Sequence, residues 1–111
     1  MIFEVAADHA GHVNALLAFS PGEYLGDPDE VAKAAARVQV PIYVTSSSSA
    51  DEVGAARTIL SASPARTKIQ YEPKYGVHGS STLIETRNPK GAAENWVHVL
   101  SFLGALSVPP S

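Results

Sequence analysis

His78 is the side chain of this sequence with the clearest potential for chemistry. It stands in the stretch Tyr75–Ser81, after Gly76 and directly before Gly79. The stretch follows a predicted strand and precedes a predicted short helix, so we expect an exposed loop. An imidazole on an exposed loop can accept or donate a proton near neutral pH, which is the chemistry of a general base or acid.

Asp51 supplies a carboxylate that can complement this imidazole. It follows the loop 45–50, lies 27 residues before His78, and that loop also follows a predicted strand. If both strands belong to one parallel sheet, the two side chains project from the same sheet edge, where open α/β sheets bind ligands. A carboxylate that holds an imidazole in one tautomer forms two-thirds of a nucleophilic triad. Two plainer interpretations stay open: an exposed loop histidine, and an acid that complements a helix dipole.

The candidate nucleophiles are serines at the same predicted edge. Ser20 ends the first predicted strand, and Ser48 belongs to the serine run 46–49. A serine attacks an ester only when a base takes its proton, so each would depend on His78. The alternative for Ser20 is a strand-end turn, and for the serine run it is loop solvation and helix capping. The sequence leaves the nucleophile open.

Two other groups of residues are candidates for binding roles. Glu23 and Tyr24 follow the first predicted strand and are candidates for lining a substrate cleft. Asp8, His9 and His12 form a short run of potential metal ligands, but no further ligand accompanies them. We therefore expect no metal site and no cofactor.

Helices and strands alternate along the sequence and would position these side chains. The alternation with short connections predicts an α/β fold, with three αβα layers around a small three-stranded parallel sheet in a single domain. The third strand alternates polar and apolar residues, which is typical of a sheet edge. The predicted helices cover 2–7, 28–38, 51–61, 80–85 and 92–106, and the predicted strands cover 13–19, 41–45 and 66–72.

Two apolar features shape the packing that we expect. Helical spacing predicts a buried face on the last helix that contains Trp96, Val99, Leu100 and Leu103. The first strand is the most apolar one, yet it would lie at an open sheet edge, which is a template for pairing. We expect a second copy of the chain, bound through residues 13–19 or neighbouring helices, or the missing part of a larger protein to cover it.

The composition disfavours several classes of protein. The 111 residues carry a formal net charge of −3, which offers no basic field for nucleic acid. The absence of cysteine excludes disulfides and thiolate metal sites and fits a cytoplasmic location. No apolar run approaches the roughly 20 residues of a membrane span.

The pattern resembles the C-terminal half of an α/β-hydrolase of the dienelactone-hydrolase or prolyl-oligopeptidase-like group. In that family the triad order is Ser, then Asp or Glu, then His, and a Gly-x-Ser-x-Gly elbow carries the serine. This sequence has no such elbow, and residues 2–7 resemble the helix that follows it, so we expect a truncated domain that starts after the nucleophile. The matching segments are Ala15–Gly22, Val40–Val44, Ala50–Val53, Val77–Gly79, and the closing helix with Trp96 and Phe102-Leu103.

The resemblance implies a function and roles for two residues. Asp51 matches the triad acid and His78 the base of an esterase-like serine hydrolase that acts on small carboxylic esters. The alternative is a catalytically inactive α/β-hydrolase fragment that folds by forming oligomers.

Overall fold

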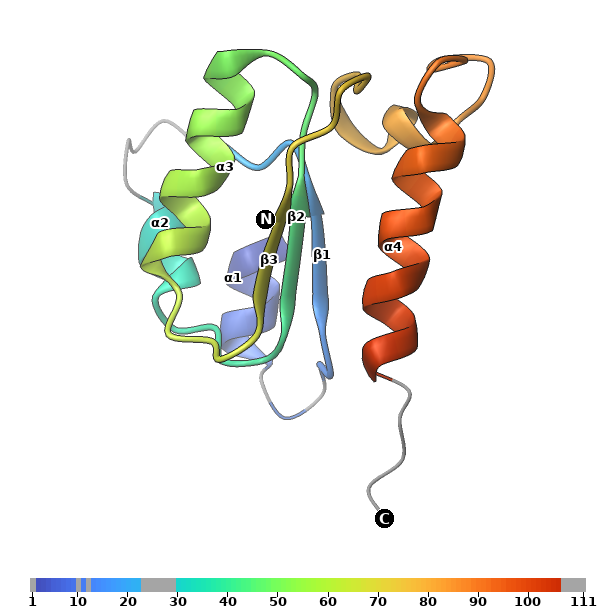
Figure 1. The fold of residues 1–111 in the computed structure, drawn as a ribbon. Helices are drawn as coiled ribbons and strands as arrows, with labels where there is room; N and C mark the ends of the chain where they lie inside the picture. Colours follow the sequence, from blue (N-terminus) through green and yellow to red (C-terminus); the bar gives the residue numbers. More distant parts are fainter. Residues whose placement is uncertain (1, 10, 12, 23–29, 107–111) are drawn as a thin grey trace.

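The computed structural model describes residues 2–9, 11, 13–22 and 30–106. Three short strands form one parallel sheet in the order β1-β2-β3, so β1 and β3 are the two edges (Figure 1). This confirms the predicted small parallel sheet and the edge position of the first and third strands. The strands are β1 (Leu16–Phe19), β2 (Ile42–Thr45) and β3 (Lys68–Tyr71).

Helices cover both faces of the sheet, which confirms the predicted three-layer α/β fold. Figure 1 shows α1, α2 and α3 on one face and α4 alone on the other. The predicted start of the second helix at residues 27–29 lies outside the described residues. The helices are α1 (Ile2–Asp8), α2 (Glu30–Ala35), α3 (Ala50–Ala62) and α4 (Ala92–Leu106), with a 3-10 helix η2 (Gly79–Leu83) before α4.

The central strand β2 divides the core into two parts. Its side chains alternate between the faces, because successive residues of a strand point in opposite directions. Ile42 and Val44 pack against α1, α2 and α3, in the larger cluster of buried apolar residues. Tyr43 points the other way and packs against Val99 and Phe102 of α4. The Tyr43 and Phe102 rings lie 5.5 Å apart between centroids.

The predicted buried face of α4 is wrong for three of its four residues. Trp96, Leu100 and Leu103 are 44%, 57% and 39% exposed, whereas Val99 is buried as predicted. The helix is apolar around most of its circumference, so helical spacing alone does not identify the side that meets the sheet. The buried side of α4 consists of Ala92, Asn95, Val99 and Phe102.

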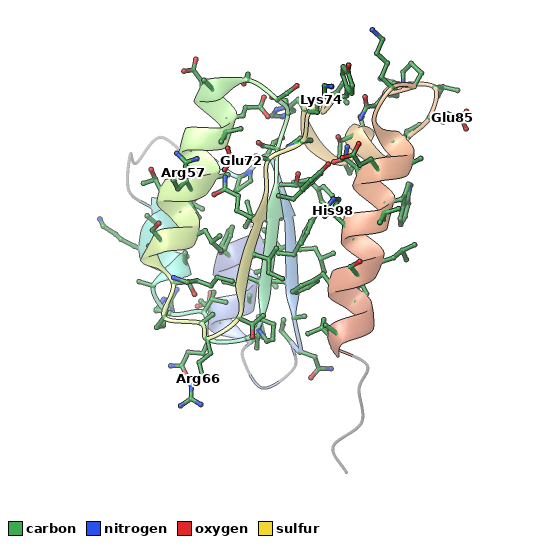
Figure 2. All side chains as sticks on the ribbon, in the orientation of Figure 1. Arg57, Arg66, Glu72, Lys74, Glu85 and His98 are labelled. Atoms are coloured by element: carbon green, nitrogen blue, oxygen red, sulfur yellow. The ribbon has the colours of Figure 1, made fainter. Side chains whose placement is uncertain are left out.

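Polar contacts join α3 and α4 to the third strand. Arg57 of α3 pairs with Glu72 at 3.2 Å, just after β3 (Figure 2). On the other face of the sheet, the imidazole of His98 stacks on the ring of Tyr71 at 3.8 Å between centroids. The Tyr71 hydroxyl also donates a hydrogen bond to Glu94 at 3.0 Å.

Among the described helices, none has the combination of length and apolar character that a membrane span needs.

Candidate active site

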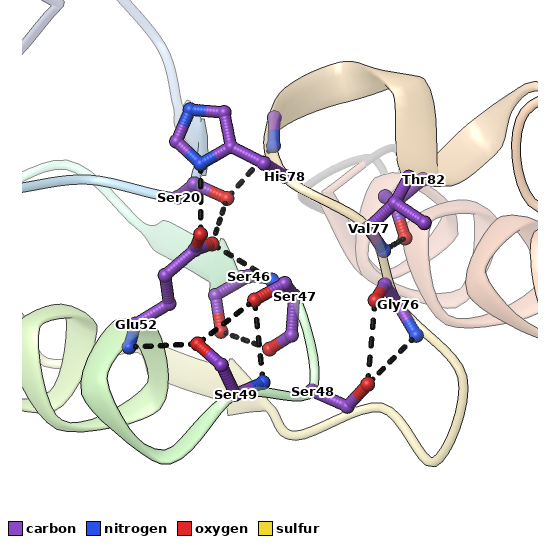
Figure 3. A network of polar contacts seen from close by, with 11 residues as sticks. Ser20, Ser46, Ser47, Ser48, Ser49, Glu52, Gly76, Val77, His78 and Thr82 are labelled. Atoms are coloured by element: carbon purple, nitrogen blue, oxygen red, sulfur yellow. Dashed lines mark hydrogen bonds and ion pairs between the residues drawn. The ribbon is translucent and has the colours of Figure 1, made fainter.

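The loops that follow the three strands meet at the carboxyl edge of the sheet. Ser20 follows β1, the serine run 46–49 follows β2, and the histidine loop 73–78 comes shortly after β3. In a parallel sheet these ends lie at one edge, so residues far apart in sequence come together. Figure 3 shows the polar network that results.

A carboxylate contacts the imidazole of His78, and it belongs to Glu52 rather than to the predicted Asp51. The Nδ1 atom of His78 lies 2.9 Å from Oε2 of Glu52. Asp51 is exposed, and no hydrogen bond joins its side chain to His78 within the described part of the chain. The edge position of the predicted acid is right, but the side chain that reaches the ring comes one residue later.

The start of α3 explains why Glu52 and not Asp51 reaches the histidine loop. Ser49 caps the helix, since its Oγ accepts a hydrogen bond from the backbone N–H of Glu52 at 3.3 Å. Glu52 is therefore the third residue of the helix, and the side chain at this position folds back over the preceding loop. It accepts a hydrogen bond from the backbone N–H of Ser47 at 3.1 Å. Asp51, one residue earlier, points to solvent.

Ser20 ties all three loops together. Its Oγ donates to Oε1 of Glu52 at 2.7 Å and accepts from the backbone N–H of Gly79 at 2.8 Å. Its own backbone N–H donates to the carbonyl of Thr45 at 2.8 Å. Ser20 is buried and has a φ of 56°, a left-handed conformation that is uncommon for a residue with a Cβ. These bonds hold a strained backbone where β1 ends.

These contacts fix the charge of Glu52. Partial burial alone would raise the pKa of this carboxyl, but hydrogen bonds from His78, Ser20 and Ser47 outweigh it and lower the pKa to about 2. Glu52 is therefore ionised near neutral pH. An ionised carboxylate at Nδ1 favours the tautomer with its proton on Nδ1, which leaves Nε2 as the basic atom of the ring.

Buried amides hold the histidine loop from the side of α4. The Nδ2 atoms of Asn88 and Asn95 both donate to the carbonyl of Tyr75, at 3.0 and 3.1 Å. Asn88 also donates to the carbonyl of Thr82 at 3.0 Å. Gly91 leaves room for this arrangement, because an added Cβ would overlap the Tyr75 carbonyl. The loop that carries His78 is thus fixed three residues before the imidazole.

Glycine is also required inside the histidine loop. A Cβ at Gly76 would lie 2.5 Å from Cγ of Pro73 and 2.8 Å from the carbonyl oxygen of Ser46. The loop therefore packs closely on the serine run that follows β2. Ser48 strengthens this contact, since its Oγ lies 3.3 Å from the Gly76 carbonyl and its backbone N–H also donates to that carbonyl.

None of the described hydroxyls forms a hydrogen bond to Nε2 of His78. This nitrogen faces away from Glu52 (Figure 3), and the side chain of His78 is 66% exposed. Ser20 donates to the carboxylate rather than to the imidazole, and Ser48 contacts Gly76. The two serines predicted as nucleophiles therefore lie at the right edge, but they contact the acid and the loop. The Glu52–His78 pair presents its basic nitrogen to solvent.

A hollow of about 280 Å³ opens beside the histidine loop. Its walls include Ser48, Gly76, Val77, Arg87 and Lys90. The volume lies just below the range of about 300–1,000 Å³ for ligand pockets, and neither His78 nor Glu52 lines the hollow.

Glu23 and Tyr24, predicted to line a cleft, lie outside the described residues, as does His12. In the part of the chain that the structure describes, no three His, Cys, Asp or Glu side chains gather as metal ligands.

Two parts of the site were missed in the sequence although each has a signal. Ser49 and Glu52 form the Ser-x-x-Glu pattern of a helix start, which predicts that Glu52 turns back toward the loop. Asn95 is a polar residue at i and i+4 spacing from Val99 on the buried side of α4. A lone amide at such a position indicates a buried hydrogen-bond partner, here the Tyr75 carbonyl.

Comparisons with family models, with curated proteins and with solved structures found no match to this chain.

Proposed function

We propose that this protein is a hydrolase of small carboxylic esters in which His78 acts as the general base and Glu52 orients it. The contact that carries the proposal is the 2.9 Å distance between Nδ1 of His78 and Oε2 of Glu52. In a hydrolytic triad, the carboxylate fixes the imidazole tautomer and stabilises the imidazolium that forms when the ring takes a proton.

The nucleophile in this proposal is a hydroxyl that reaches Nε2 from solvent, with water as the simplest case. Ser20 is assigned a positioning role, because its hydroxyl is hydrogen-bonded to Glu52. Water attack with general-base help at His78 would transfer a proton to Nε2, form a tetrahedral intermediate, and release the alcohol and the acid. In this proposal the protein acts in the cytoplasm, which suits a chain without cysteine.

The test measures hydrolysis of p-nitrophenyl acetate and butyrate by the wild type and single variants. We expect His78→Ala to lower kcat/KM by about 100-fold, in the range of general-base catalysis. Glu52→Gln should lower it by about tenfold, mainly through kcat, since the ring keeps its place but loses its charged partner. Asp51→Asn should leave the rate within about twofold, because Asp51 does not contact the ring.

Surface histidines can hydrolyse activated esters without a site, so the matched control is His9→Ala. His9 is exposed and lies just after α1, away from the carboxyl edge. Equal rates for His78→Ala and His9→Ala would reject the proposal. So would a Glu52→Gln variant that is fully active while His78→Ala is inactive, because the carboxylate would then orient nothing.

A second candidate is an inactive α/β domain that is stable only as an oligomer. Two observations favour it: the absence of a hydroxyl partner for Nε2 among the described residues, and the exposed apolar side chains of α4. It predicts that wild type and His78→Ala hydrolyse esters at the same background rate. The same assay therefore separates the two candidates.

A further inference from the structure

The outer side of α4 carries a continuous apolar surface. Four of its large apolar side chains are between 39% and 60% exposed, and we call this surface the outer α4 face: Trp96, Val97, Leu100 and Leu103. Trp96, Leu100 and Leu103 follow the i, i+4, i+7 spacing of one helix side. Figure 1 shows no other described element on the far side of α4 from the sheet.

We propose that a second copy of this chain covers the outer α4 face through an antiparallel contact between the two α4 helices. The four side chains expose roughly 400 Å² on one protomer, so two copies in contact would bury about 800 Å² from these side chains, the size of a weak interface. An apolar patch of this size is as large as the largest patch on a typical monomer, and such patches are often functional.

The charges on α4 favour a second copy over a membrane. Glu94 is the only Asp, Glu, Lys or Arg within Ala92–Leu106, and it is engaged with the Tyr71 hydroxyl. Two such helices therefore approach one another without strong repulsion between like charges. Helices that lie on membranes usually carry Lys or Arg along their polar side, and α4 has neither.

The order of large and small residues fits a twofold axis at Leu100. In an antiparallel pair centred there, Leu100 meets the partner's Leu100, Val97 meets the partner's Leu103, and Trp96 meets the partner's Gly104. A Cβ added at Gly104 would have no atom within 4 Å, so open space lies where the indole would pack. Such self-complementarity is what an isologous interface requires.

Burial of Trp96 in this contact would leave no donor without a partner. Its indole N–H already donates to the carbonyl of Leu83 within the same chain, at 2.7 Å. The apolar part of the ring can therefore be covered without the cost of an unpaired N–H.

Cysteine cross-linking provides a direct test, because the chain contains no cysteine. In the Leu100→Cys variant, the two thiols would lie opposite one another at the axis, within reach of a disulfide. We expect mild oxidation at 10 µM to convert most of this variant to a covalent dimer. The matched control is Val5→Cys on α1, which is 50% exposed but lies off the outer α4 face. Equal cross-linking of the two variants would overturn the proposal.

Solution size supplies a second, independent measurement. Light scattering on the wild type at 100 µM should give twice the 11.6 kDa of one chain. Leu100→Arg places two cations against each other at the axis and should weaken association by at least 100-fold, with an unchanged far-UV circular dichroism spectrum. On dilution, the emission of the single tryptophan should shift to longer wavelength in the wild type only. A monomeric wild type at 100 µM, or a Leu100→Arg variant that stays dimeric, would overturn the proposal.

Discussion

The two faces of the sheet differ in the number of helices that cover them and in the size of the apolar cluster buried beneath. On one face, three helices bury a large cluster of apolar side chains, including Phe3, Val31, Ala35 and Ile59. On the other face, α4 alone buries a small cluster, and its outer side remains apolar and exposed. The first face therefore holds the larger core, and the second holds a smaller one behind a single helix.

The candidate site lies where the two layers meet. Glu52 is the third residue of α3, so the three-helix layer fixes the carboxylate. His78 leads into η2 and α4, and the amides of Asn88 and Asn95 hold its loop from that side. The hydroxyl of Ser20, at the end of β1, donates to Glu52 and accepts from the backbone N–H of Gly79, which joins the two layers. The acid and the base therefore depend on different halves of the fold.

The largest effect that we predict tests the completeness of the three-helix core. Ile42→Ala removes a fully buried side chain of β2 from that face. We expect a loss of about 2–5 kcal/mol in the free energy of unfolding, because the surrounding helices cannot close the cavity. Urea denaturation followed by far-UV circular dichroism measures it. Ile69→Ala, on the neighbouring strand at 41% exposure, should cost less than about 1 kcal/mol and serves as the control.

A smaller loss should follow when the α4 layer releases the histidine loop. Asn88→Ala deletes the amide that donates to the carbonyls of Tyr75 and Thr82. We expect a cost of about 1–3 kcal/mol, since buried carbonyls lose a donor. Hydrogen exchange should accelerate in residues 75–79 more than in β2. Uniform acceleration throughout the sheet would contradict the division into two layers.

The ionisation of Glu52 should make the stability of the folded protein depend on pH. The pKa of Glu52 is about 2 in the folded protein and 4.5 as its ordinary value. Between these values the unfolded chain binds more protons, so stability rises with pH across this window and the contribution is complete above about 4.5. It disappears as pH falls through about 2.

The measurement compares wild type with Glu52→Gln by urea denaturation from pH 2 to pH 7. We expect a difference of about 1–2 kcal/mol at pH 7 that shrinks steadily below pH 4.5, a modest value because His78 is largely exposed. Glu72→Gln removes a surface ion pair with Arg57 and should change stability by less than about 0.5 kcal/mol. A Glu52→Gln difference that does not vary with pH would contradict the charge assigned to Glu52.

The sequence was informative where local chemistry decides the outcome. The order of elements, the parallel sheet and the bounds of α4 follow from apolar runs, turn residues and the switch between helical and strand spacing. The common edge of His78 and the acid follows from the parallel topology alone. Such features depend on patterns that extend over only a few residues.

Side-chain choices that depend on packing could not be predicted in the same way. Asp51 and Glu52 are adjacent acids, and only the turn of α3 determines which one reaches the imidazole. On α4, apolar residues surround most of the helix, so its sequence pattern fits burial of Trp96 as well as burial of Phe102. Packing against the sheet buries Phe102 and leaves Trp96 partly exposed. Where several residues fit a sequence pattern equally well, tertiary packing determines which of them is buried or reaches the site.

The smallest predicted effect concerns Tyr43, on the face of the sheet that packs against α4. Tyr43 neighbours Ile42 on β2 but points toward α4, and its hydroxyl is buried without a hydrogen bond to any described residue. A buried hydroxyl without a partner costs stability, whereas a phenylalanine ring fills almost the same space. We therefore expect Tyr43→Phe to change the free energy of unfolding by zero to about 1 kcal/mol, in the stabilising direction. Paired denaturation curves for Tyr43→Phe and Ile42→Ala would compare two adjacent residues on opposite faces. A loss above about 1 kcal/mol in Tyr43→Phe would mean that the hydroxyl has a hydrogen-bond partner in solution. The core beneath α4 would then not carry the cost of this unpaired hydroxyl.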